Sequence, residues 1–299
     1  MSEPRICVVG AGPVGCLLAA ALAEHSCHVV WMVRDSARRQ AVAQFTLDVA
    51  GAPYQPHLER ITLPDSMALA EPPDWLVVAV KAQDVETALA TYWQSSATRV
   101  LVSANGLVAG AFHLGLLYGG AYLDAGRLVT STANHLTAGP LRGAEGDTVE
   151  LAALLDAPWL GVATEPDIEV PQWHKLALNC VANPLTALLD CINGDALPLL
   201  DGPLAGGLLA ECDIVAHAKL IRRWPHTLQS LRSDLRVLLE ATRGNSSSMR
   251  EDLRAGRETE ISHMNLAVAE AGAQRGLPCP LNESLGRMVS LISANRGTL

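Results

Sequence analysis

Short runs of aliphatic residues, many of them β-branched, alternate with Ala- and Leu-rich stretches along the first third of the chain. The runs predict buried strands at 5–9, 27–33, 75–80 and 99–103, with further strands near 127–133 and 160–164. The Ala- and Leu-rich stretches predict helices at 13–25 and 84–93. Because strand, helix and strand follow one another at this spacing, we expect right-handed βαβ units and a parallel sheet, which is an α/β fold.

After about residue 170 this alternation gives way to helical periodicity. Apolar positions recur at helical spacing over 172–189, 203–224, 226–242, 250–275 and 281–294. Gly and Pro occupy the gaps, so the second half is expected to be all-helical. The boundary is expected within 164–171, where Pro166 and Pro171 flank acidic residues, and it divides the chain into domains 1–168 and 169–299.

The composition narrows the class of protein. Apolar residues make up 49% of the 299 positions and charged residues 18%, so the chain can bury a sizeable core. Acidic residues outnumber basic ones by 31 to 22, and the net charge of −9 argues against nucleic acid or an anionic membrane as a partner. Seven cysteines without a CxxC pair disfavour a disulfide framework and predict a reduced, cytoplasmic location.

Two long uncharged segments resemble targeting or membrane sequences. Residues 6–23 end like a signal peptide, but glycines and Pro13 interrupt them. Residues 100–123 are long enough to span a bilayer, but they contain five glycines together with Asn105 and His113, which a lipid-facing helix tolerates poorly. We therefore predict no targeting or membrane segment.

A glycine motif, Gly10-Ala11-Gly12-Pro13-Val14-Gly15, directly follows the first predicted strand and opens the first predicted helix. In this context G-x-G-x-x-G is typical of a Rossmann dinucleotide-binding domain. The first Gly permits the tight turn, the second the approach of the pyrophosphate, and the third close helix–strand packing. The alternative is a glycine turn in a Rossmann-like domain that binds nothing.

Basic residues follow the second predicted strand. NAD-binding proteins usually carry an acidic residue there, whereas this chain has Arg34, then Asp35, with Arg38 and Arg39 a turn later. Because a guanidinium can pair with a 2′-phosphate through two hydrogen bonds, the sequence favours NADP over NAD. Asp35 leaves NAD open, and a solvated basic helix start is the alternative.

A narrow polar line runs along an otherwise apolar helical stretch. Lys175, Asn179 and Asn183 are spaced i, i+4, i+8 and lie on one helix face. A buried polar group that lacks a hydrogen-bond partner costs about 1–3 kcal/mol. A substrate could be that partner. Lys175 is one of three lysines beside 19 arginines, and a lysine, unlike an arginine, can release its proton. The alternative is that Lys175 reaches solvent and the asparagines bind backbone carbonyls near Pro184.

The chain carries several separated motifs: the glycine motif, Val80-Lys81-Ala82, Asn105-Gly106, 175–187 with Asn193-Gly194, 246–249, 252–254 and 259–261. In their order and spacing, along nearly the whole chain, these motifs resemble those of the ketopantoate reductases (2-dehydropantoate 2-reductases). The resemblance implies a Rossmann domain followed by a helical domain like that of 6-phosphogluconate dehydrogenase. It also implies reduction of 2-dehydropantoate to pantoate with NADPH, on the route to pantothenate.

The resemblance also implies roles for individual residues. Lys175 would be the general acid at the substrate ketone, and Glu260 would hydrogen-bond near it. Asn179, Asn183, Asn193 and Ser248 would contact the substrate. Arg34 and Lys81 would contact the adenosine-phosphate end of NADP, and Asn105 would lie on the nicotinamide side. An ammonium beside the ketone would stabilise the negative charge that hydride addition places on oxygen.

Simpler interpretations remain for some of these residues. Ser248 could begin a helix, because residues 248–251 fit a capping box, and Glu260 could form a surface pair. Asn193-Gly194 and Asn105-Gly106 could be plain turns, the latter between a strand and a helix. Glu260 and His263 are spaced like metal ligands but lack further partners, so no metal is predicted.

Alternatives to the function also remain. Ser103-Ala104 differs from the family's usual residues beside Asn105, which leaves another branched 2-oxo acid open as the small-molecule substrate. An opine- or 3-hydroxyacid-type dehydrogenase shares the two-domain plan, and an NADP-sensing module would bind without turnover. The sequence leaves the oligomeric state open, a homodimer included.

Overall fold

The computed structural model describes residues 3–65, 68–110, 112–124, 126–130, 134–141 and 148–296. The chain divides into two compact units: unit 1 is Met1–Ala104 with Ala109–Ile168, and unit 2 is Asn105–Val108 with Glu169–Leu299. The segment 105–108, which the sequence assigned to the first domain, packs with the second. The two units are described separately.

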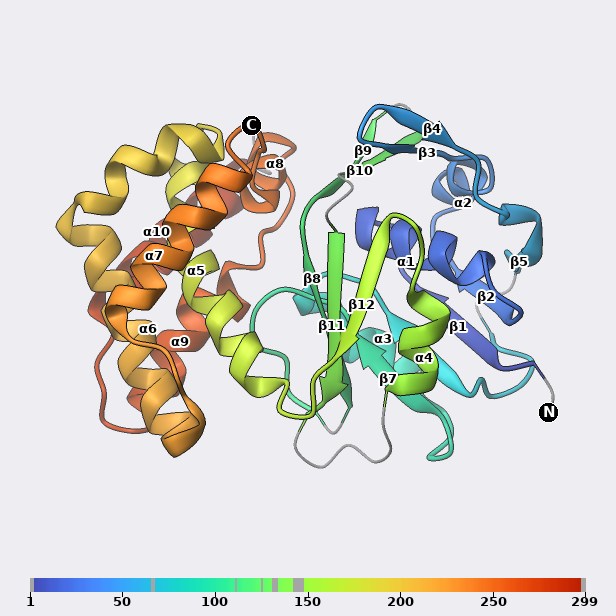
Figure 1. The fold of residues 1–299 in the computed structure, drawn as a ribbon, viewed down its shortest axis with the longest axis horizontal. Helices are drawn as coiled ribbons and strands as arrows, with labels where there is room; N and C mark the ends of the chain where they lie inside the picture. The colour runs from blue at the N-terminus through green and yellow to red at the C-terminus, as the bar shows by residue number, and fades with distance from the viewer. Residues whose placement is uncertain are drawn as a thin grey trace. The chain divides into compact units, whose positions relative to one another are not determined.

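The main sheet of unit 1 is mostly parallel (Figure 1). In the described residues its strands lie in the order β12 (Leu160–Thr164), β11 (Asn134–Pro140), β8 (His113–Tyr118), β7 (Arg99–Val102), β6 (Trp75–Val78), β1 (Arg5–Val9), β2 (His28–Met32) and β5 (Ile61–Thr62). The pair β8–β11 is antiparallel, and the other neighbouring pairs are parallel. The predicted strands at 5–9, 27–33, 75–80, 99–103 and 160–164 all lie in this sheet.

The central strands are continuous apolar runs in the sequence because they are buried. All four residues of β6 and the last four of β1 are buried, as parallel strands covered on both faces require. The helices of unit 1 are α1 (Pro13–Ala23), α2 (Ser36–Val42), α3 (Val85–Tyr92) and α4 (Val149–Leu155), with short 3₁₀ turns at η1 (Leu58–Arg60) and η2 (Ala82–Asp84). From Gly15 to its end α1 is buried, so it joins the core.

A second, smaller sheet was mostly missed by the sequence pattern. Its order is β4 (Ala52–Tyr54), β3 (Thr46–Val49), β10 (Arg127–Thr130) and β9 (Ala121–Asp124). Ala50 and Gly51 both have positive φ in the two-residue turn between β3 and β4, a backbone that suits a tight hairpin. Strand β10 pairs in parallel with β3, which lies far away in sequence. Residues 131–133 of the predicted strand 127–133 lie outside the described residues.

The uncharged segment 100–123, whose glycines argued against a lipid-facing helix, contributes strands. Its described residues include most of β7, all of β8 and part of β9. Within the described residues no single helix has the length and apolarity to cross a bilayer, although α5 and η3, bent by 113°, meet that test as a pair.

Unit 2 is helical. Its helices are α5 (Glu169–Leu188), α6 (Pro203–Leu220), α7 (Leu228–Ala241), α8 (Ser248–Arg254), α9 (Asn265–Ala273) and α10 (Pro280–Arg296), with 3₁₀ segments η3 (Asn193–Asp201), η4 (Ile221–Arg223) and η5 (Ile261–His263) (Figure 1). The predicted helical range 250–275 is wrong as one helix. The chain leaves α8 at Ala255, and Gly256 with φ of 63° cannot continue a right-handed helix.

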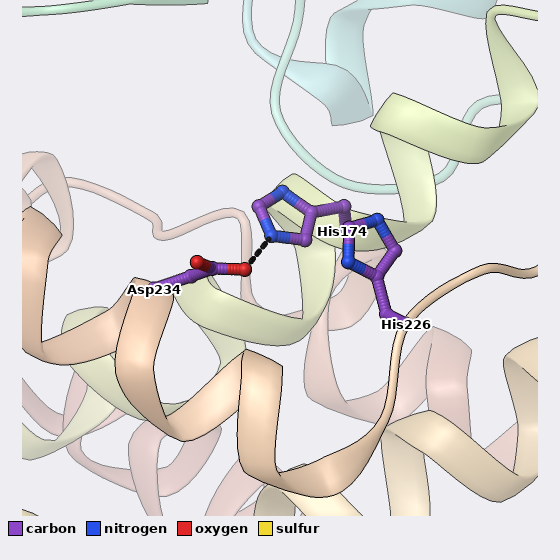
Figure 2. Close-up of side chains that lie close together, drawn as sticks. All are labelled: His174, His226 and Asp234. Atoms are coloured by element: carbon purple, nitrogen blue, oxygen red, sulfur yellow. Dashed lines mark hydrogen bonds and ion pairs between the residues drawn. The ribbon is translucent and has the colours of Figure 1, made fainter.

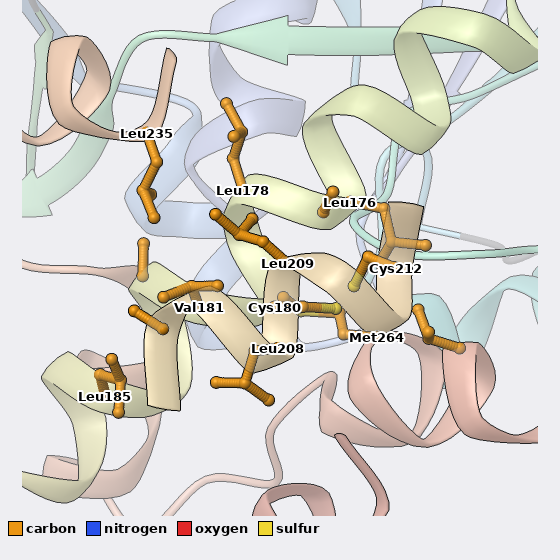
Figure 3. Close-up of a cluster of buried hydrophobic side chains, with 14 of the residues drawn as sticks. Leu176, Leu178, Cys180, Val181, Leu185, Leu208, Leu209, Cys212, Leu235 and Met264 are labelled. Carbon is orange, nitrogen blue, oxygen red and sulfur yellow. The ribbon is translucent and has the colours of Figure 1, made fainter. Parts of the chain in front are cut away.

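The long helix α5 forms much of the core of unit 2. Figure 3 shows its apolar side chains, Leu176, Cys180 and Val181 among them, interleaved with Leu208 and Leu209 of α6. Pro184 lies inside α5 and removes the donor that would bind the carbonyl of Cys180. The buried side chain of Asn265 supplies that donor instead, with Nδ2 2.8 Å from the oxygen. A distant residue therefore keeps α5 helical through its proline.

Candidate active site

The glycine motif in unit 1 forms the turn from β1 into α1. Gly10 has φ of 112°, and a Cβ there would overlap the carbonyl oxygen of Ala79. A Cβ at Gly15 would overlap the carbonyl oxygen of Gly10, whereas one at Gly12 would have nothing within 4 Å. The first and third glycines are thus required by packing, and the second leaves space beside the backbone.

That space lies at the start of a helix. Pro13 is the first residue of α1, and Gly12 has no side chain to cap the free N–H groups of the first turn. The Trp31 indole donates to the Gly10 carbonyl oxygen at 2.8 Å, and Arg38 Nε donates to that of Ala11 at 3.0 Å. Uncapped amides, open space at Gly12 and a nearby guanidinium fit the pyrophosphate of a dinucleotide.

The residues after β2 are arranged around the start of α2. Arg34 is exposed, and Asp35 caps α2 by accepting from the Arg38 N–H at 2.6 Å. Arg39 donates to the Val33 carbonyl oxygen at 3.2 Å. Because Asp35 already serves as a helix cap, Arg34 and Arg38 are the charged side chains left to meet a ligand here. Sequence reasoning noted Arg38 only as part of a basic cluster, without its contact to the glycine motif.

Lys81 lies beyond the end of β6. It is half-buried and stands at the start of η2, two residues after Ala79, which packs under Gly10 and Gly15. The carboxyl ends of β1 and β6 are neighbours in the parallel sheet. Lys81 therefore belongs to the same edge of unit 1 as the glycine motif.

In unit 2 a chain of hydrogen bonds joins an amine, an amide and a carboxylate. Lys175 Nζ donates to Asn105 Oδ1 at 3.1 Å, and Asn105 Nδ2 donates to Glu260 Oε2 at 2.9 Å. Glu260 is buried, with 8% of its surface exposed, and Lys175 and Asn105 are half-buried. The sequence assigned Asn105 to the nicotinamide side. In the structure it lies between the two residues assigned to catalysis.

The loop that carries Asn105 is held by its backbone. Gly106 has φ of 85°, and a Cβ there would overlap the carbonyl oxygen of His263 in η5. Leu107 N–H donates to that same oxygen at 2.7 Å, and Gln172 Nε2 donates to the Gly106 oxygen at 3.3 Å. Asn105-Gly106 is therefore a docking loop and not a strand-to-helix turn. It fixes the amide against α5 and η5.

Burial lowers the pKa of Lys175 from 10.5 to about 8, and the negative charge of Glu260 opposes part of that shift. The amine remains mostly protonated at neutral pH but gives up its proton more readily than an ordinary lysine. Such a group suits proton donation near pH 7.

Of the three polar side chains in line on α5, only Lys175 has a hydrogen-bond partner within the described ranges. Among the described residues we find no hydrogen bond from the side chains of Asn179 or Asn183, and both are partly exposed. The alternative in which they satisfy carbonyls near Pro184 is wrong, because Asn265 binds the freed oxygen. Both amides are available to a ligand.

Two predicted substrate residues lie elsewhere in unit 2. Asn193 begins η3, and its Nδ2 donates to Thr242 Oγ1 at 2.8 Å, while Oδ1 is buried without a partner in the described structure. Ser248 is exposed as the first residue of α8. The cap predicted for Ser248 is formed one residue earlier, by Ser247, which accepts from the Arg250 N–H at 3.2 Å.

Comparison with known proteins identifies the family of this chain. The family description "Ketopantoate reductase PanE/ApbA" matches residues 6–138, and its C-terminal counterpart matches residues 167–293. The 2-dehydropantoate 2-reductase of Salmonella typhimurium is 31% identical over 297 residues, covering 95% of this chain and 94% of the relative. The chain belongs to the ketopantoate reductase family. It is therefore an oxidoreductase that acts on a ketone or the corresponding alcohol, and the family depends on NAD(P)H.

The chain is also similar to a relative of lower identity and to solved structures. The 2-dehydropantoate 2-reductase of Archaeoglobus fulgidus is 26% identical, covering 97% of this chain and 98% of the relative. The ketopantoate reductase structure from Ralstonia eutropha superposes with a TM-score of 0.78 at 24% identity, covering 97% and 98%. D-mandelate dehydrogenase with NADH and anilino(oxo)acetate gives 0.83 at 19% identity over the same shares. The predicted family and the predicted fold class are confirmed.

Proposed function

We propose that this chain reduces 2-dehydropantoate to pantoate with NADPH, on the route to pantothenate, and that Lys175 is the general acid. The observation that carries the proposal is the hydrogen-bonded series Lys175–Asn105–Glu260 with the lowered pKa of its amine. The Salmonella typhimurium relative, 31% identical along nearly the whole chain, carries the name of this activity.

Each residue of the series has a separate task in this proposal. Lys175 donates its proton to the ketone oxygen as that oxygen gains negative charge. Asn105 holds the amine in place by accepting from it, and Glu260 holds Asn105 and keeps the amine protonated. Asn179 and Asn183, one and two turns along the same helix face, offer amides to the hydroxyl and carboxylate of the substrate.

The cofactor binds through unit 1 in this proposal. When bound, NADPH supplies the hydride that adds to the carbon of the ketone. The uncapped start of α1 and the nearby Arg38 receive the pyrophosphate, and Arg34 pairs with the 2′-phosphate. Because the Asp35 carboxylate caps α2, it is poorly placed to select the ribose hydroxyls of NADH.

A second candidate is the reduction of another 2-oxo acid. The high TM-score to D-mandelate dehydrogenase favours it, because that enzyme shares the whole fold at 19% identity. The fold therefore admits an aromatic substrate class beside the branched one. The residues proposed for proton donation serve both candidates equally.

The test is a substrate series. We expect oxidation of NADPH to be fastest with 2-dehydropantoate, as judged by kcat/KM, ahead of other branched 2-oxo acids and of the 2-oxo acid that corresponds to mandelate. A higher kcat/KM with the aromatic acid would replace the first candidate by the second. Absence of turnover with every 2-oxo acid, in a protein that binds NADPH, would contradict both.

A further inference from the structure

Three side chains of unit 2 that could ligate a metal ion lie close together, and one of them belongs to the residue before Lys175. His174 is on α5, Asp234 is on α7, and His226 is in the connection that leads into α7. One ligand atom from each of these residues lies within 4.8 Å of the other two. Figure 2 shows the three side chains pointing toward one another, with His174 Nε2 2.9 Å from Asp234 Oδ2.

The neighbouring residues hold His226 in place. Its ring stacks on that of His174, with centroids 4.3 Å apart and planes at 24°. On another side the Trp224 ring lies 4.7 Å away, and its indole N–H donates to Asp213 at 2.7 Å. Thr227, the next residue, begins α7 with a capping box. The imidazole is therefore oriented by packing before any ligand binds.

The ring nitrogens of His226 have no hydrogen-bond partner in the part of the chain that the structure describes, although the ring is only partly exposed. A half-buried imidazole that is held rigidly and lacks a partner is available to a ligand. His174 on α5 and Asp234 on α7 are already in contact with each other.

Two imidazoles and a carboxylate are a ligand set suited to zinc and similar ions. Zn²⁺ binds such atoms at about 2.0–2.2 Å, which places tetrahedral ligand atoms about 3.4 Å apart. The three atoms here all lie within 4.8 Å of one another, which is near that spacing. The side chains of His174 and Asp234 are 20% and 41% exposed, so an ion can enter and retain a water ligand. Nitrogen ligands disfavour Mg²⁺ and Ca²⁺.

We propose that His174, His226 and Asp234 bind one divalent transition-metal ion, of which Zn²⁺ is the model. The sequence pointed only to Glu260 and His263 as possible metal ligands and predicted no metal. The three residues here are 52 and 8 residues apart and form no short motif. The ion would tie α5 to α7 at the residue next to Lys175, and so stiffen the helix that carries the proposed general acid. The site is independent of the proposed function, because none of its ligands takes part in the reaction.

The test is a titration of metal-free protein with ZnCl₂, followed by calorimetry and by competition with a chromophoric chelator. We expect one ion per chain. The His226→Ala and Asp234→Asn variants should each bind at least ~10-fold more weakly, since they lose a ligand. His57→Ala is the matched control, because His57 pairs with Glu24 and Glu59 in unit 1 and is not one of the three proposed ligands. It should bind as the wild type does.

Absorption spectroscopy of the wild-type protein gives a second test, which does not depend on how the variants fold. Co²⁺ added to the wild-type protein should give visible bands typical of nitrogen and oxygen ligands, and excess Mg²⁺ should not remove them. Absence of binding by the folded wild-type protein would overturn the proposal, and the trio would be a hydrogen-bonded stack alone. Thiolate bands in the near ultraviolet, or equal affinity in folded His226→Ala, would overturn it too.

Discussion

The glycine motif of unit 1 and the Lys175 series of unit 2 are built in opposite ways. The glycine motif is six consecutive residues, and its geometry is set by backbone packing between neighbouring strands. The Lys175 series joins side chains that are 70 and 155 residues apart. A contiguous site depends on individual backbone positions, whereas an assembled one depends on the helices and loops that present its side chains. Substitutions should therefore affect the two sites differently.

The largest effect is expected for Lys175→Ala. We expect kcat to fall by at least ~100-fold, as for the loss of a general acid, while NADPH binding measured by fluorescence stays unchanged. Lys219→Ala, an exposed lysine on α6, is the control and should keep wild-type kcat. Unchanged turnover in Lys175→Ala would remove this residue from the mechanism and leave the assembled site without its proton donor.

The glycines of the contiguous site should separate folding from binding. Gly15→Ala places a Cβ against the Gly10 carbonyl oxygen, so we expect a loss of about 3 kcal/mol in the free energy of unfolding. Gly12→Ala meets no protein atom, so its melting temperature should match the wild type while NADPH affinity falls by ~10-fold or more. Equal NADPH affinity in Gly12→Ala and wild type would mean that the space beside Gly12 holds no pyrophosphate.

The support of α5 can be tested by a pair of substitutions. Asn265→Ala leaves the Cys180 carbonyl without this hydrogen-bond donor. The free energy of unfolding, measured with denaturant, should fall by about 2–3 kcal/mol. Pro184→Ala restores an N–H that can bind that carbonyl, so the double variant should recover part of the loss. Additive losses in this double-mutant cycle would show that Asn265 stabilises α5 in another way.

The cofactor preference of unit 1 should depend on Arg34. Arg34→Ala removes a charged partner of the 2′-phosphate, so kcat/KM with NADPH should fall by ~10-fold and that with NADH should change little. Arg127→Ala, an exposed arginine paired with Asp124 in the smaller sheet, is the control. Equal losses with both cofactors would count against an NADP-selective role.

The smallest effect is a shift in pH dependence. Since the general acid must be protonated, kcat/KM should be level below pH 8 and fall as the pH rises through about 8, the pKa of Lys175. Glu260 raises this pKa, so Glu260→Gln should move the fall to lower pH, by about 1 unit. Glu240→Gln, a paired glutamate on α7, should leave the profile unchanged. A fall that stays in place in Glu260→Gln would mean that the carboxylate does not act on the amine.

The sequence by itself determined the parts of the molecule that short-range pattern controls. The apolar runs of β1, β2, β6 and β7, the glycine turn after β1 and the polar line on α5 are all read within a few residues. Each follows from local chemistry: burial of continuous apolar strands, the φ that only glycine adopts readily, and the repeat of the helix. The family resemblance, which depends on such short motifs, was recognisable for the same reason.

Only the tertiary structure decided which distant groups meet. It brought Asn105 between Lys175 and Glu260, Asn265 to the carbonyl freed by Pro184, and β10 beside β3. It also placed His226 against His174 and Asp234, where no spacing indicated a site. Such contacts close long loops and form only when the packed core fixes both ends, so their energy depends on the whole fold and leaves no local periodicity to detect.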